Sequence, residues 1–311
     1  MQRFKNILMV LTGRETDRQT IGQAAALAVN NGASLSLLEV IEVPESEVSR
    51  LSSRLKGRDL AGLYIEDRKA EIEALLAGKN LPLSRVDVVF GIPFITVIRH
   101  VHRHAFDLVI MTAEGEGGLK QKLFGTTSLN LIRKCPCPLW VLKPSREAAG
   151  QGRILAAVDP ADPGDARAGL NRKIMELAAS LAAMGGGELH VVHVWEFFGE
   201  SLLLKRAVVS AGELDAMVEQ EKESHRQALD SLALQYPAPG IRRELHLLRG
   251  VPGEVIPGFA EDHGVNLIVM GTVSRQGLAG FLIGNTAEQV IQKVDCSVLT
   301  IKPDGFVSPV Q

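Results

Sequence analysis

The chain has 311 residues, of which 46% are hydrophobic and 23% charged, values typical of a folded globular protein and not of disordered or fibrous sequence. Because a typical domain has about 100 to 200 residues, this length favours two domains. The 34 lysines and arginines stand against 36 aspartates and glutamates, and the resulting net charge of -2 argues against a dedicated nucleic-acid-binding protein.

Cysteine usage and hydropathy bear on the compartment. Cys135, Cys137 and Cys296 are an odd number without the spacing of a zinc site, which favours a reducing, intracellular setting. The N-terminal apolar run Ile7–Leu11 is shorter than the core of a signal peptide. No uninterrupted apolar stretch approaches the roughly 18 residues of a membrane span. We therefore expect a cytoplasmic protein without a membrane span.

Continuous apolar runs, taken in chain order, predict strands. Runs that are hydrophobic on both faces are typical of a parallel sheet covered by helices on both sides. In the first half the predicted strands are Ile7–Leu11, Leu35–Val43, Val86–Phe90, Leu108–Met111 and Leu139–Leu142. In the second half they are Ile154–Val158, Leu189–Trp195, Glu244–Leu248, Leu267–Met270 and Val298–Ile301.

Helical segments separate these runs. Good helix formers over Gln23–Asn31 stop at Gly32, and those over Ile174–Met184 stop at Gly185. A surface helix in the second half is predicted to align one apolar stripe, made of Leu214, Met217, Val218, Ala228, Leu229 and Leu232. Five strands with interleaved helices, twice, predict an α/β protein of two tandem doubly wound, Rossmann-like domains, each with a five-stranded parallel sheet.

The second half is a diverged copy of the first. GIPFITVIRHVHRHAFDLVIMT, from Gly91, matches GVPGEVIPGFAEDHGVNLIVMG, from Gly250, at an offset of 159 residues. KNILMVLT, ending at Thr12, matches GRILAAVD, ending at Asp159, at an offset of 147, so twelve extra residues accumulate inside the second copy. The repeat predicts a first domain over residues 1–145 and a second over residues 152–304, joined by a short linker.

The loop after the fourth strand is glycine-rich in both copies. It reads TAEGEGGLKQKLFGTTSLNLIRKC in the first copy and GTVSRQGLAGFLIGNTAEQVIQKV in the second. In an open α/β sheet, ligands bind beyond the carboxyl ends of the strands, where such loops lead into helix N-termini. Glycine lets backbone N–H groups approach a phosphate, and the positive end of the helix dipole favours an anion.

These loops resemble the signature of the universal stress protein family, G-x2-G-x9-G-[ST], and the ending GNTAEQVIQKVDCSVLTIKP looks like the tandem, E-type subgroup of that family. The resemblance covers essentially the whole chain as two fused copies. The first copy has Thr112 where the first glycine belongs. The second copy has Ser274 in place of the second glycine and Asn285 in place of the final serine or threonine.

The resemblance implies an adenine-nucleotide site, with ATP as the ligand, in the second domain. Nucleotide-binding members carry an aspartate after the first strand, which Asp159 matches and Thr12 does not. Asp159 would accept hydrogen bonds from ribose hydroxyls or the adenine amino group. The other residues assigned to the nucleotide are Val194 beside the adenine, Met270 and Gly271 at the ribose, and Ser274, Gly284, Asn285 and Thr286 at the phosphates. The departures from the signature imply weak binding, and no metal is required by the protein itself.

The same resemblance implies a non-enzymatic stress-response protein. Two alternatives stay open at this point: a slow nucleotide hydrolase or transferase with Asp159 as its acidic group, and a protein-interaction scaffold with vestigial pockets and an unidentified protein partner. Glycines at strand-to-helix turns also occur for backbone geometry alone.

Clustered histidines are interpreted as side chains without metal. On a helix, His100 and His104 share a face and His102 points away. His190 and His193, three apart on a strand, point to opposite faces. Cys137 and Cys296 occupy the same repeat position beside the last strand and are expected to be small buried thiols.

The last strand of each copy bears on assembly. Single-copy family members typically dimerise through this strand, and here it is kept as PLWVLKP from Pro138 and SVLTIKP from Ser297. We therefore expect the two strands to pair antiparallel within one chain, as an intrachain pseudo-dimer with no exposed last-strand edge.

Overall fold

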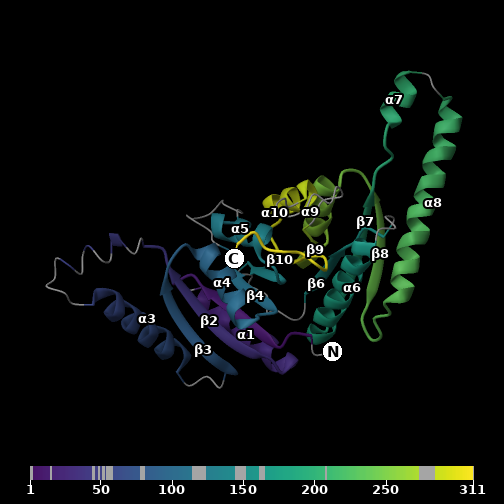
Figure 1. Cartoon of the computed structure of the whole chain (residues 1–311). Helices are drawn as coiled ribbons and strands as arrows, with labels where there is room; N and C mark the ends of the chain where they lie inside the picture. Colours follow the sequence, from purple (N-terminus) through teal and green to yellow (C-terminus); the bar gives the residue numbers. More distant parts are fainter. Residues whose placement is uncertain are drawn as a thin grey trace. The chain divides into compact units, whose positions relative to one another are not determined.

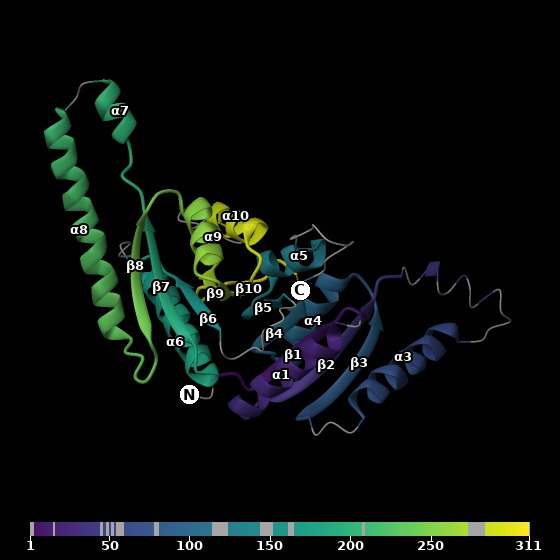
Figure 2. The ribbon, with the colours of Figure 1, turned by 180° about the vertical axis from the view of Figure 1, so that it is seen from behind.

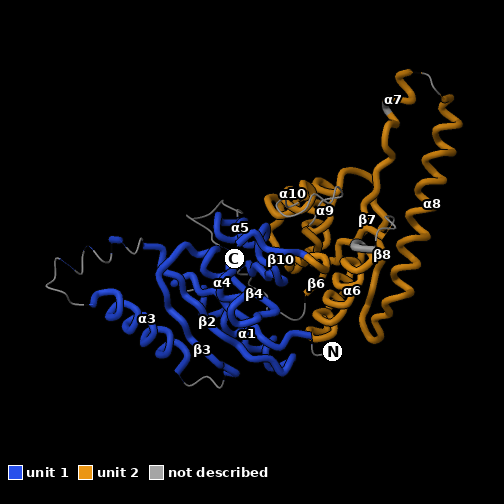
Figure 3. The backbone as a smooth tube through the Cα atoms, viewed as in Figure 1, with its two compact units in different colours: residues 1–146, 278–282, 306–311 blue, residues 147–277, 283–305 orange. Residues whose placement is uncertain are grey.

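Strands and helices alternate along the chain in the computed structural model, which describes residues 3–14, 16–43, 46–47, 50, 53, 59–77, 81–113, 124–143, 152–160, 165–206, 209–272 and 284–310. The chain divides into two compact units (Figures 1 and 3). Unit 1 consists mainly of residues 1–146 and unit 2 mainly of residues 147–277 and 283–305. Within the described ranges, no helix is long and apolar enough to cross a membrane.

Unit 1 contains a parallel sheet with the strand order β3-β2-β1-β4-β5. The central strands β1 and β4 are almost wholly buried, and α3 packs along the outer strand β3 (Figure 2). The elements are β1 (Asn6–Leu11), α1 (Asp17–Asn31), β2 (Ser34–Ile41), α3 (Leu60–Leu76), β3 (Leu83–Phe90), α4 (Pro93–His104), β4 (Leu108–Thr112), α5 (Thr126–Lys134) and β5 (Leu139–Leu142).

Unit 2 repeats this topology with the strand order β8-β7-β6-β9-β10, again all parallel. Helix α6 packs on β6, β7 and β9, α8 packs on β7 and β8, and α9 packs on β7 and β9. The elements are β6 (Arg153–Ala157), α6 (Asp165–Gly185), β7 (Glu188–Trp195), α7 (Glu200–Lys205), α8 (Ala211–Gln235), β8 (Arg243–Arg249), α9 (Pro252–Asp262), β9 (Val265–Gly271), α10 (Asn285–Lys293) and β10 (Ser297–Ile301).

The predicted fold class is confirmed, and every predicted strand overlaps an observed one. Helix bounds differ more. Helix α1 begins at Asp17, six residues before the predicted start. The prediction missed the first turns because they are polar and carry no apolar pattern. Helix α6 begins at Asp165 and continues through Gly185, and it ends where Gly186 adopts a left-handed φ of 63°.

The apolar stripe of α8 is only partly buried. Leu214, Leu229 and Leu232 are buried as predicted, but Met217 is 43% exposed. In Figure 1 the N-terminal part of α8 runs past the end of the sheet and lies beside α7. The predicted stripe therefore holds both buried and exposed residues along the same helix.

Strand register locates the twelve extra residues of the second copy. Ile7 pairs with Leu35 as Ile154 pairs with Leu189, so the offset is 147 residues on the first strand and 154 on the second. On the third strand it is 159, since Leu245 pairs with β7 as Val86 pairs with β2. Seven extra residues thus lie between the first and second strands, and five between the second and third.

Candidate functional site

The residues that the resemblance assigns to a nucleotide lie at one edge of the unit 2 sheet. There β9, β6 and β7 end as neighbours, and the register pairs Ala157 of β6 with both Val192 and Met270. The N–H of Gly284 donates to the Thr272 carbonyl at 2.9 Å, which brings the start of α10 to the end of β9. This edge collects Asp159, Val194, Met270, Gly271, Gly284, Asn285 and Thr286. Ser274 lies outside the described residues.

The turn after β6 is held by a side chain of α6. The Asp159 N–H donates to Asn171 Oδ1 at 3.1 Å, and Asn171 Nδ2 donates to the Asp159 carbonyl at 2.9 Å. The buried Asn171 amide therefore fixes the main chain of Asp159 and makes these two contacts without using the Asp159 carboxylate.

Gly271 has a packing role that sequence reasoning missed. A Cβ on this residue would lie 2.5 Å from Leu170 Cδ2, closer than real side chains approach. Leu170 of α6 thus covers Gly271 directly. The absence of a side chain at position 271 lets α6 pack against the end of β9.

The start of α10 supplies main-chain donors. Gly284 is its N-cap, and among the described residues no side chain makes a cap hydrogen bond to this helix. Asn285 and Thr286 in the first turn are exposed, whereas Val194 and Met270 are buried in the core. The first N–H groups of a helix and its dipole attract an anion, so this turn can receive phosphate oxygens.

In the corresponding turn of unit 1, one carboxylate accepts several hydrogen bonds from the turn. Buried Asp17 accepts hydrogen bonds from the N–H groups of Thr12 and Gly13, at 2.9 and 2.8 Å, and from the Thr12 hydroxyl at 3.0 Å. Thr112, at the position of Gly271, is buried and lies 2.9 Å from the Thr20 hydroxyl. In unit 1, Thr12 therefore stands in place of Asp159 and Thr112 in place of Gly271, and both make internal hydrogen bonds.

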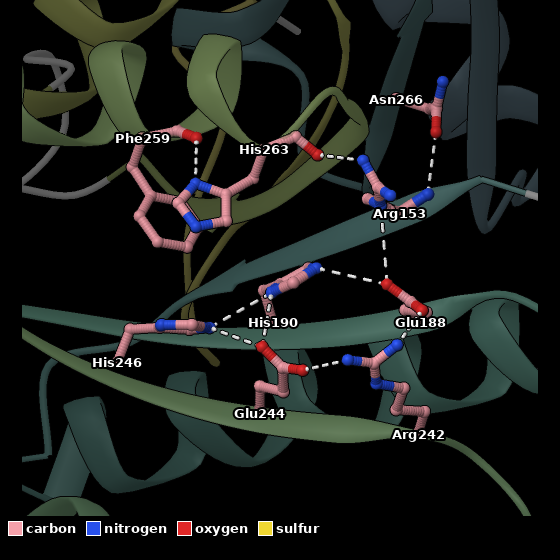
Figure 4. A network of polar contacts seen from close by, with 9 residues as sticks. All are labelled: Arg153, Glu188, His190, Arg242, Glu244, His246, Phe259, His263 and Asn266. Atoms are coloured by element: carbon pink, nitrogen blue, oxygen red, sulfur yellow. Dashed lines mark hydrogen bonds and ion pairs between the residues drawn. The ribbon is translucent and has the colours of Figure 1, made fainter.

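A second cluster lies elsewhere in unit 2, on the face of the sheet that α9 covers (Figure 4). His190 of β7 pairs in register with Glu244 of β8, and His246 lies two residues further along β8, on the same face as Glu244. His190 Nδ1 lies 3.1 Å from His246 Nε2. Glu244 Oε2 lies 3.9 Å from His190 Nδ1 and 3.8 Å from His246 Nε2.

Arginine and carboxylate groups surround this cluster. Arg242 donates to Glu188 Oε1 and to Glu244 Oε1, both at 2.8 Å, so it connects two neighbouring strands. Its hydrogen bond lowers the pKa of the Glu244 carboxyl below its usual range. Burial lowers the pKa of His190 and of His246, which favours neutral imidazoles.

Sequence reasoning placed His190 and His193 on opposite faces of their strand, as the structure has them. His193 faces the other side, where its Nε2 lies 2.8 Å from Nδ1 of His225 on α8. What was missed is that a neighbouring strand adds Glu244 and His246 beside His190. The alternation Glu-x-His on a strand was the available signal, because residues two apart share a face.

The helical histidines of unit 1 lie as predicted. His100 and His104 share a face of α4, with ring centroids 5.7 Å apart, and His102 is exposed. Arg85 Nη1 lies 2.8 Å from His104 Nε2. Burial, followed by the charge of Arg85, lowers the pKa of His104.

The cysteines are less buried than expected. Cys137 and Cys296 are both partly exposed, while Cys135 is buried, and all three are free thiols. Cys135 Sγ and Cys137 Sγ lie 3.6 Å apart. This contact raises the pKa of the Cys137 thiol well above its usual range and disfavours the reactive thiolate.

Comparison with known proteins places the chain in a family. The profile of the universal stress protein family matches residues 3–143 and 152–302. Universal stress protein E of Escherichia coli K12 is 29% identical over 318 residues, covering 100% of this chain and 98% of that protein.

Solved structures agree in fold. A Pseudomonas aeruginosa PAO1 protein of unknown function is 23% identical with a TM-score of 0.72, covering 97% of this chain and 94% of its own. A universal stress protein of Archaeoglobus fulgidus is 17% identical with a TM-score of 0.59, covering 96% of each chain. On the two family matches, which together span most of its length, this chain belongs to the universal stress protein family and carries two copies of its domain.

Proposed function

We propose that this protein is a non-enzymatic, cytoplasmic stress-response protein whose second domain binds an adenine nucleotide such as ATP, weakly and at one site per chain. The observation that carries the proposal is the difference between the two turns after the first strand. In unit 1, Asp17 takes the hydrogen bonds of Thr12 and Gly13. In unit 2, Asn171 contacts the main chain of Asp159.

Each part of the proposed site matches one part of a nucleotide. The Asp159 carboxylate can accept hydrogen bonds from ribose hydroxyls or from the adenine amino group. The first turn of α10, which follows Gly284, offers main-chain N–H groups to the phosphates. Because β6, β7 and β9 are adjacent and parallel, all of these groups lie at the same edge of one sheet.

Two features predict weak binding. Leu170 covers Gly271, so a ribose placed there requires a shift of that side chain. Asn285 replaces the hydroxyl residue of the family signature beside the phosphates. Loss of one hydrogen bond to a charged group costs about 1.5–3 kcal/mol, which weakens a micromolar site roughly tenfold to a hundredfold.

Isothermal titration calorimetry of the full chain with ATP tests the proposal. We expect one weak site per chain, lost in Gly284→Glu, where a carboxylate would meet the phosphates, and kept in the matched unit 1 variant Gly125→Glu. Asp159→Ala should weaken binding without adding bulk to the α10 turn, and thermal melting checks that each variant is folded. Two equal sites, or loss of binding only in Gly125→Glu, would overturn the assignment. Release of inorganic phosphate from ATP by the wild type but not by Asp159→Ala would support a hydrolase instead.

The family resemblance also supports a proposal on assembly: the last strands β5 and β10 pair antiparallel within one chain. Such pairing would protect two sheet edges from pairing with other chains. A protease site inserted within residues 145–152 tests it. After cleavage, the two halves should still elute together in size-exclusion chromatography. Separate elution of two folded halves would contradict the pairing.

A further inference from the structure

The cluster of His190, Glu244 and His246 has the dimensions of a metal site. Its three facing atoms, His190 Nδ1, His246 Nε2 and Glu244 Oε2, are separated by 3.1, 3.8 and 3.9 Å. Zinc binds imidazole nitrogen and carboxylate oxygen at about 2.0–2.2 Å in tetrahedral geometry, which places ligand atoms roughly 3.3–3.6 Å apart. Small side-chain adjustments would therefore bring all three atoms onto one ion.

Hydrogen bonding alone leaves this arrangement incomplete. The two imidazole nitrogens can share one proton at 3.1 Å, but Glu244 Oε2 stays beyond hydrogen-bond distance of both. The other oxygen of this carboxylate accepts from Arg242 at 2.8 Å. Oε2 is the oxygen that faces the imidazoles, and a cation between the three groups would join them all.

The surroundings of the second ring nitrogen of His190, Nε2, also support a metal site. A metal on Nδ1 requires the proton on Nε2, and histidine ligands almost always donate this proton to a carboxylate, a backbone carbonyl or water. His190 Nε2 is buried without a hydrogen-bond partner in the described part of the chain, and Glu188 Oε2 lies 3.8 Å away. Arg242 and Arg153 contact Glu188 at 2.8 and 3.4 Å, so this carboxylate is already positioned (Figure 4).

Access to the cluster is one-sided. The His190 side chain is 4% exposed, whereas that of Glu244 is 40% exposed. On the α9 side, Phe259 and His263 stack with ring centroids 3.8 Å apart and lie against the rings of His190 and His246. With three protein ligands on two paired strands, a tetrahedral zinc ion would take water as its fourth ligand.

We propose that His190, Glu244 and His246 form a binding site for one divalent transition-metal ion of the zinc class, with Glu188 as a positioning residue for His190. The site is on a face of the sheet and is separate from the residues proposed for the nucleotide. The ligand set, two histidines and one carboxylate with an open position, is one that zinc uses in proteins.

Titration of the chelator-treated, untagged full chain with zinc tests the proposal. We expect one site per chain by calorimetry, and Co²⁺ as a spectroscopic probe should give the visible absorption of a low-symmetry nitrogen and oxygen site. Glu244→Gln and His246→Gln should each weaken zinc binding more than about 100-fold. Glu188→Gln should weaken it about 10- to 100-fold while the stoichiometry stays at one.

The imidazole pair on the opposite face provides a matched control. His225→Gln removes the partner of His193 on the same strand β7 and should leave zinc affinity unchanged. Circular dichroism checks the fold, and Glu244 is exposed enough for its conservative variant to fold. Absence of zinc binding to the wild type, or affinity unchanged in both Glu244→Gln and His246→Gln, would overturn the proposal.

Discussion

The two units have the same sheet but differ in charge at one corresponding point. With the offsets given by the strand register, Ser36, Arg85 and Asp87 of unit 1 stand where His190, Glu244 and His246 stand in unit 2. Arg85 lies 3.6 Å from the Asp87 carboxylate, so unit 1 carries a guanidinium within the cluster. Unit 2 instead turns a carboxylate toward two imidazoles. Identical backbone pairing thus supports an internal ion pair in one copy and a candidate cation site in the other.

The turns after the first strands of the two units also differ in their hydrogen bonding. At the offset of 154, Asn171 of α6 stands where Asp17 stands in α1. Asp17 makes bonds to several groups of the turn, and Asn171 makes two to the main chain of one residue. The seven extra residues of unit 2 lie between this strand and its successor.

The largest expected effect comes from copying unit 1 into unit 2 at the metal cluster. Glu244→Arg places a guanidinium, as Arg85 has in unit 1, beside the two imidazoles. Its repulsion of the ion, together with the lost ligand, should weaken zinc binding roughly 1000-fold or more. Calorimetry measures the affinity, with Arg85→Glu in unit 1 as the control that leaves the unit 2 site intact. If Glu244→Arg bound zinc with an affinity within tenfold of the wild type, the proposed difference between the two clusters would be wrong.

The next effect concerns the turns. Asp17→Ala leaves several donors of a buried turn without an acceptor and should lower the unfolding free energy of unit 1 by about 3 kcal/mol. Asn171→Ala should cost unit 2 about 1–2 kcal/mol. Trp140 lies in unit 1 and Trp195 in unit 2, so urea unfolding of single-tryptophan variants follows each unit by fluorescence. Equal losses in the two units would show that the turns are equally dependent on these residues.

A smaller effect is expected at Gly271. Gly271→Ala places a Cβ against Leu170 and should destabilise unit 2 by about 1–3 kcal/mol through overpacking. Adding Leu170→Ala removes the clash, so the double variant should lose less stability than the sum of the single variants. Additive losses, measured by the same unfolding assay, would mean that Leu170 does not restrict position 271.

The smallest effect lies at the end of α4. Ala105 has a left-handed φ of 52°, and the corresponding residue of unit 2 is Gly264 with a φ of 57°. Because alanine is strained in this region, Ala105→Gly should stabilise unit 1 by about 0.5 kcal/mol after the entropy of glycine in the unfolded chain is counted. Gly264→Ala should destabilise unit 2 by about 1 kcal/mol. A loss of stability in Ala105→Gly would contradict this reading.

Much of the fold could be predicted from local pattern. Continuous apolar runs identified the strands, and the repeat with its two offsets identified two copies of one topology. These features could be predicted because burial on both faces of a parallel strand imposes an apolar residue at nearly every position. The bounds of α1 and α6 could not, since their first turns are stabilised by contacts such as that of Asn171 with Asp159, which an apolar pattern does not record.

The sequence alone also determined that His190 and His193 face opposite sides, because strand periodicity is local. Only the tertiary structure decided that His246, 56 residues further along the chain, lies beside His190, and that Leu170 covers Gly271. Such neighbours depend on which strands pair, in which register, and on how a helix packs over their ends. Register is selected by burial of the whole sheet rather than by any short segment, so the polar groups that it brings together become visible only once the sheet is formed.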